Sequence, residues 1–110
     1  MARNATNSVK YAFAGKEAFC LRRAITLKAS RQGGFFVYSY NPLGITAYGR
    51  TKVESLRAFV MELSSAWHRI ALAQDDILAP DALELKQKLI KLVKSVRPIR
   101  EVLSELNQDA

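Results

Sequence analysis

The chain has 110 residues, of which 49% are hydrophobic and 25% are charged, and a formal net charge of +7. This length and composition favour one globular domain with a modest core and exclude a disordered polymer. No apolar run approaches the roughly 20 residues that a membrane-spanning helix requires. The polar N-terminus lacks the apolar stretch of a secretion signal, so we expect a cytoplasmic protein.

The positive charge is concentrated in the first half of the chain. Residues 1–53 contain nine Lys or Arg and one acid, whereas residues 54–110 contain eight bases and nine acids. This asymmetry indicates an anionic partner, either nucleic acid or the acidic face of a protein. The alternative is that the basic face only keeps the protein soluble.

The N-terminal part of the chain is predicted to form a small sheet. Residues 1–7 are predicted to be disordered, and residues 8–17 fit either a strand or a short helix. Alternation of apolar and polar residues, aromatic and β-branched content and glycine-containing turns then predict three strands. The strands are expected at 21–29, 35–40 and 45–48. Short connections between them indicate an antiparallel meander.

A long helix is expected directly after the meander. Thr51 and Glu54 have the spacing of a capping box, in which the hydroxyl accepts from the N3 amide and the carboxylate reaches back. The helix extends to about residue 73, and its apolar stripe is expected to lie on the sheet. The stripe consists of Val53, Leu56, Phe59, Val60, Leu63, Trp67, Ile70 and Ala71.

The last third of the chain is predicted to be helical. Pro80 suits the first turn of a second amphipathic helix that runs to about Ser95, with a row of exposed bases. That row is Lys86, Lys88, Lys91 and Lys94. A short helix from Ile99 to Leu106 follows. We therefore predict one α+β domain over 1–110, with a core at 19–73 and a C-terminal helical extension at 80–107.

The sequence contains no pattern typical of a catalytic or metal site. Cys20 is the only cysteine and His68 the only histidine, whereas a structural zinc site needs four such ligands. Cys20 is expected to be a small strand residue, and His68 a structural or surface residue. The glycines do not form a phosphate-binding motif. We expect no metal, no cofactor and no enzyme.

Basic and aromatic residues of the predicted strands form a candidate interaction surface. They are Arg22, Arg23, Lys28, Arg31, Phe36, Tyr38, Tyr40, Tyr48 and Arg50. The rings could stack on nucleic acid bases while the cations neutralise phosphates. Equally, the rings could form cross-strand pairs within the sheet or a dimer surface.

The region 33–56 resembles the N-terminal domain of HicB antitoxins. The likeness is carried by a Gly-and-aromatic strand at 33–38, the turn and short strand at 43–49, and a Gly-x-Thr-x-x-Glu-x-Leu junction from Gly49 to Leu56. The resemblance covers roughly residues 21–72 and implies a protein-binding role, in which the domain covers a small toxin. HicB-like antitoxins usually add a further strand and a C-terminal DNA-binding region, which are not evident at 75–110.

A second interpretation depends on residues 8–17. If they are helical, the order α-β-β-β-α is similar to that of double-stranded RNA-binding domains. We predict a non-enzymatic protein-interaction module of HicB-like fold, antitoxin-like or regulatory, that forms a homo-oligomer through its sheet or C-terminal helices. The alternative is a small basic nucleic-acid-binding protein.

Overall fold

The computed structural model describes residues 7–108, and this part of the chain has an α+β fold with two small antiparallel sheets. The predicted fold class is confirmed. The elements are β1 (Ser8–Ala14), β2 (Glu17–Thr26), β3 (Lys28–Gln32), β4 (Phe35–Tyr40), β5 (Ile45–Gly49), α1 (Lys52–Ala66), α2 (Pro80–Leu92), β6 (Val93–Pro98) and α3 (Ile99–Gln108).

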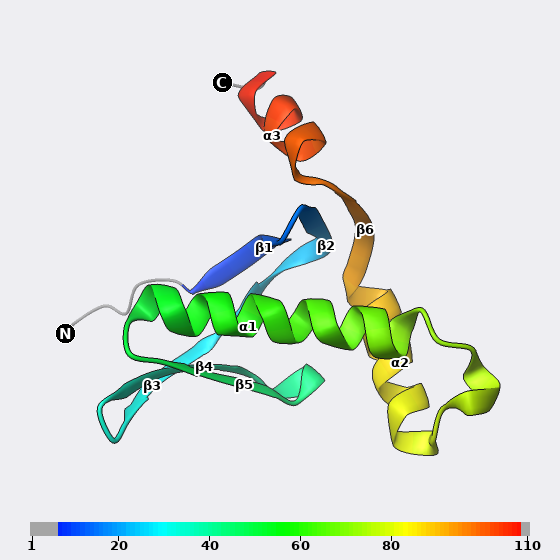
Figure 1. Cartoon of the computed structure of the whole chain (residues 1–110), viewed down its shortest axis with the longest axis horizontal. Coiled ribbons are helices and arrows are strands. Elements are labelled where there is room, and N and C mark those ends of the chain that lie inside the picture. The colour runs from blue at the N-terminus through cyan, green and yellow to red at the C-terminus, as the bar shows by residue number, and fades with distance from the viewer. Residues whose placement is uncertain (1–6, 109–110) are drawn as a thin grey trace.

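The predicted meander is present, but its first strand is shorter than expected. The sheet has the order β3-β4-β5, and α1 lies alongside β4 and β5 (Figure 1). The strand expected over 21–29 is divided near Leu27, because the chain passes there from one sheet to the other. Most of that predicted strand belongs to β2, which pairs with β1 and β6 instead.

A bulge in β2 interrupts the alternation on which that prediction was based. Val9 pairs with Ile25 and Tyr11 pairs with Cys20, so four residues of β2 face only Lys10 of β1. Bulges of this kind bend a strand and direct side chains out of the sheet. Arg22 and its two successors are accordingly exposed.

The second sheet, of order β1-β2-β6, contains one strand that the sequence left open, β1, and one that it did not predict, β6. Residues 8–14 form β1, so the helix required for the RNA-binding-domain order is absent. The second helix was expected to reach Ser95 but ends at Leu92, and the extension at 80–107 is therefore not wholly helical. Lys94 consequently lies on β6 rather than in the predicted helical row.

The predicted disorder at 1–7 concerns residues that lie outside the described part of the chain, except for Asn7. The carbonyl oxygen of Asn7 accepts a hydrogen bond from the Leu27 amide at 2.9 Å. This bond fixes the start of β1 beside the junction between β2 and β3.

The main core lies between α1 and the two sheets. Phe59 and Leu63 of α1 are fully buried there together with Phe19 and Leu21 of β2. A smaller cluster on the other face of β2 contains Cys20, and α3 covers it. Cys20 is thus a buried free thiol on a strand.

The junction between β5 and α1 is held by short-range contacts. The Thr51 hydroxyl accepts from the Glu54 amide at 3.1 Å, and the Glu54 carboxylate accepts from the Arg50 amide at 2.9 Å. The predicted cap is therefore confirmed, although the carboxylate reaches one residue further back than in a standard capping box. The buried Ser55 hydroxyl donates to the Ala47 carbonyl at 2.9 Å.

Gly49 allows α1 to approach β5 closely, so Gly49→Ala should destabilise the fold. An added Cβ would lie 2.3 Å from the Ser55 backbone nitrogen, which can move only if α1 shifts. We expect a loss of about 3 kcal/mol in the free energy of unfolding, measured by urea denaturation.

Gly34→Ala is the matched control. Gly34 has a φ of +85° but open space around its Cα, so this substitution should cost only about 1 kcal/mol of backbone strain. Equal losses in the two variants would show that the approach of α1 to β5 is not tight.

Candidate interaction groove

An open groove of about 430 Å³ lies between β1 and the first turns of α1. Its floor is the stretch Ser8–Phe13 of β1. Its wall is formed by Val53, Leu56, Arg57 and Val60, which share one side of the helix because they are three or four residues apart. We call this site the β1–α1 groove.

Apolar side chains of the β1–α1 groove are exposed to solvent. Val53 is 64% exposed and Leu56 39%, whereas the sequence predicted that both would pack on the sheet. Tyr11 and Phe13 of β1 are also exposed, but they pair with Cys20 and Ala18 and therefore face the side of the sheet that α3 covers, away from α1. The apolar stripe of α1 is thus wider than the core that it covers, and the uncovered part lines the groove.

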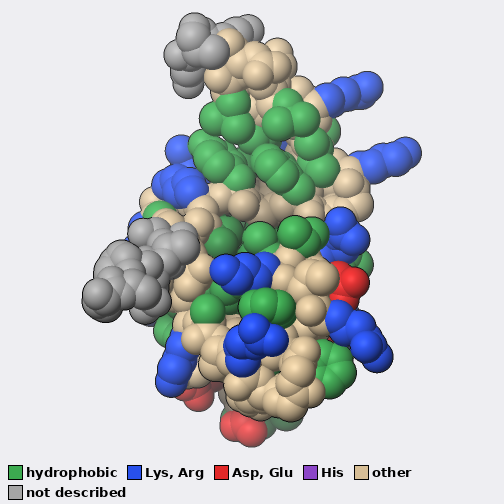
Figure 2. Space-filling view, turned by 90° about the vertical axis from the view of Figure 1, so that its left-hand side faces the viewer, with side chains coloured by type: hydrophobic (Ala, Val, Ile, Leu, Met, Phe, Trp, Pro, Cys, Tyr) green, Lys and Arg blue, Asp and Glu red, His purple; other side chains and the backbone are tan. Residues whose placement is uncertain are grey.

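The charged residues that line the β1–α1 groove are cations, Lys10 and Arg57. The Lys10 ammonium donates to the Arg22 carbonyl in the β2 bulge at 3.1 Å, which brings the exposed Arg22 and Arg23 next to β1. Among the described residues, none of these four takes part in an ion pair. Figure 2, which shows this side of the molecule, has basic and hydrophobic side chains interspersed and few acidic ones.

The residues predicted as one interaction surface do not form one. Tyr38 and Tyr40 are each 9% exposed and belong to the core, so their assignment to the surface was wrong. Alternation places both on the same face of β4, but only the position of α1 determines that this face is covered. They cannot stack on nucleic acid bases.

The other predicted surface residues are exposed or partly exposed but separated. Arg31 lies over the Phe36 ring at 4.6 Å in the β3–β4 hairpin, and Tyr48 is 52% exposed on β5. Lys28 and Arg50 are exposed on β3 and after β5. These residues belong to the meander, whereas Arg22 and Arg23 belong to the other sheet.

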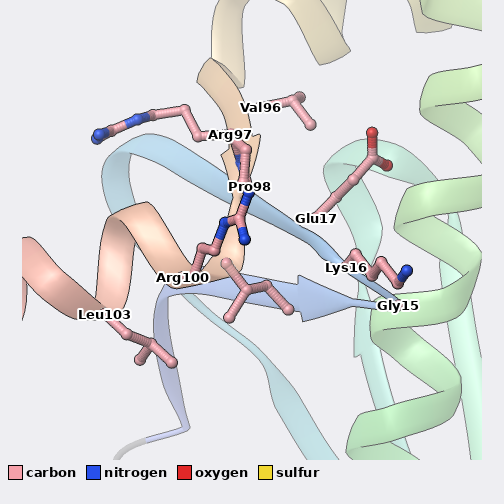
Figure 3. A pocket seen from close by; sticks show the side chains of 9 residues that line it. Gly15, Lys16, Glu17, Val96, Arg97, Pro98, Arg100 and Leu103 are labelled. Carbon is pink, nitrogen blue, oxygen red and sulfur yellow. The ribbon is translucent and has the colours of Figure 1, made fainter.

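A second cavity, of about 750 Å³, lies between the β1–β2 turn and the junction of β6 with α3. In Figure 3, two of its three lining cations, Lys16 and Arg97, point away from each other. The Arg97 guanidinium binds Glu105 and, at 3.5 Å, Glu101 on α3. These ion pairs form a junction between β6 and α3 beside the cavity.

The Arg97 guanidinium changes the acidity of its partner. Its hydrogen bond to Glu105 holds the pKa of that carboxyl below the ordinary value of 4.5, with smaller electrostatic contributions from Arg97 and Lys94. Both partners are solvent-accessible, so salt weakens the pair. The pair links α3 to β6.

His68 and Asp75 form structural contacts elsewhere in the fold. The His68 Nε2 lies 2.8 Å from the Glu17 carboxylate, and its ring meets Phe19 edge-on. Asp75 pairs with Lys86 at 2.7 Å. Within residues 7–108 no three His, Cys, Asp or Glu side chains are grouped as metal ligands, and no helix is long and apolar enough to cross a membrane.

Comparisons with protein-family models, curated proteins and solved structures find no match to this chain. The resemblance to HicB antitoxins therefore stays a prediction based on the residues at 33–56.

The Arg97–Glu105 pair should make the attachment of α3 dependent on pH. Because the pKa of Glu105 is lowered in the folded state, its contribution is present above pH 4.5 and is lost as the pH falls through the folded-state pKa. The protection of α3 amides, measured as exchange relative to the intrinsic rate at each pH, should therefore fall on acidification more in the wild type than in Glu105→Gln.

Glu62→Gln on α1 is the control, because none of the ion pairs among the described residues includes Glu62. This variant should keep the acid-dependent exchange of α3. If Glu105→Gln retained the full wild-type acid response, the pair would not hold α3.

Proposed function

We propose that this chain is a cytoplasmic, non-enzymatic protein-interaction module that binds a protein partner in the β1–α1 groove. The observation that carries the proposal is the exposure of Val53 and Leu56 in the groove, with Lys10 and Arg57 around them. Apolar centres with polar surroundings are typical of protein-binding sites.

The resemblance to HicB antitoxins suggests a more specific form of this protein-binding role. The order β3-β4-β5-α1 agrees with the order of elements that the resemblance implies. β6 is a strand that follows α1 and α2, although it joins the sheet of β1 and β2 and not the meander. The order of the meander and α1 supports an antitoxin-like or regulatory role. The basic groove, however, favours a partner with an acidic docking surface over a basic toxin.

Nucleic acid binding is the second candidate, favoured by the exposed Arg22 and Arg23 of the β2 bulge. It would operate through phosphate contacts, since Tyr38 and Tyr40 are buried. A gel shift that weakens with salt and is lost on charge reversal of both arginines would support it. The predicted homo-oligomer also stays a prediction, which light scattering of the purified protein would test.

Removing apolar area from the groove should weaken partner capture. We expect the double variant Val53→Ala, Leu56→Ala to recover a specific partner from the native host at least about tenfold less well, because each truncation removes buried apolar area from the complex. Recovery is measured by quantitative mass spectrometry after affinity capture.

Ile90→Ala is the matched control, since Ile90 is an exposed apolar residue of α2 outside the groove. It should leave recovery unchanged. Partner recovery that is equal for the double variant and the wild type would exclude the groove as the binding site.

A further inference from the structure

Among the described strands, β1 is an edge strand that is paired on one side only. In the sheet β1-β2-β6 it pairs with β2 alone among the described strands. The amide and carbonyl groups along its other side are therefore available to a further strand. Edges of this kind bind extended peptides by main-chain hydrogen bonds, with side-chain pockets providing specificity.

The β1–α1 groove runs beside β1, from Ser8 to Phe13. Six extended residues span about 20 Å, so the floor could accommodate a strand of about that length. The apolar wall from Val53 to Val60 rises only about 10 Å along the helix axis. Such a wall can contact about two side chains of an added strand, at positions i and i+2, because alternate side chains share a face.

The positive charge of the groove indicates which kind of peptide segment would bind there. Lys10 and Arg57 line it, Arg22 and Arg23 lie in the adjacent bulge, and the groove has no acidic lining residue. Acidic residues flanking the two apolar anchors would be attracted to this field, whereas a basic segment would be repelled. A second copy paired through β1 would bring another Lys10 and Arg57 to the same site, which disfavours self-association there.

We propose that the partner contributes an extended acidic segment, which adds to β1 as a further antiparallel or parallel strand and places two alternate apolar side chains against Val53 and Leu56. This inference rests on the proposed protein-binding function. In addition, the backbone edge of β1 would be the element that recognises the ligand, and the ligand would be an acidic strand.

Synthetic peptides test the strand directly. The probe is a fluorescent heptapeptide with two valines separated by one threonine and flanked by glutamates on both sides, and its affinity is measured by fluorescence anisotropy. A peptide with lysine in place of each glutamate should bind at least about tenfold more weakly. Backbone N-methylation of the amides on one edge should weaken binding at least tenfold, and methylation on the opposite edge should have a smaller effect.

Charge reversal at Arg57 tests whether the positive charge of the groove attracts the acidic peptide. Arg57→Glu should weaken binding of the acidic peptide at least tenfold and reduce its salt dependence. Arg100→Glu makes the same change in net charge at an exposed position of α3 outside the groove, and should leave the affinity within about twofold of wild type. Peptide binding should also slow hydrogen exchange at alternate amides of β1.

The results of these experiments distinguish strand addition to β1 from the protein-binding function on which it depends. If neither peptide bound, if the two bound equally, or if methylation of either edge had no effect, strand addition by an acidic segment would be wrong. The proposed function would survive that result if the Val53 and Leu56 truncations still abolished partner capture. A competition experiment tests nucleic acid as the ligand. If an oligonucleotide displaced the acidic peptide, bound more tightly than it and required Arg57, the ligand of the groove would be nucleic acid and not an acidic protein segment.

Discussion

The close approach of α1 to β5 is the contact on which the rest of the structure depends. The Ser55 side chain is fully buried and donates to the Ala47 carbonyl, and Gly49 has no Cβ that would push the helix away. These contacts fix where α1 begins and how it is rotated about its axis. In this rotation Phe59 and Leu63 point into the core between the two sheets.

The same rotation accounts for the β1–α1 groove. Once Phe59 and Leu63 face the core, the helical period places Val53 and Leu56 beside β1, where no described element covers them. Full burial of an aliphatic side chain contributes about 1.5–3 kcal/mol of favourable free energy. A partner that covered the exposed parts of Val53 and Leu56 would therefore gain binding free energy from their burial. The β1–α1 groove is therefore a consequence of how α1 is anchored.

Local chemistry was predictable from the sequence, whereas pairing between distant segments was not. Turn glycines and the Thr51 cap located β4, β5 and the start of α1, because these features depend on neighbouring residues. β6 was missed because Val93 and Val96 continue the apolar spacing of α2, and only pairing with β2 makes them a strand. For the site, the sequence identified Val53 and Leu56 as apolar but could not show that the sheet ends before it reaches them.

The distribution of charged residues over the chain makes the potential of the groove positive. In the C-terminal half, several acids are paired with bases: Glu105 with Arg97, Glu84 with Lys88, and Asp75 with Lys86. The N-terminal half has one acid, Glu17, and it contacts His68. The cations of β1 and the β2 bulge lie on one side together with Arg57 of α1, because these elements adjoin there. The charge asymmetry along the chain thus becomes a positive field beside an unpaired strand edge, which favours acidic ligands at the apolar groove.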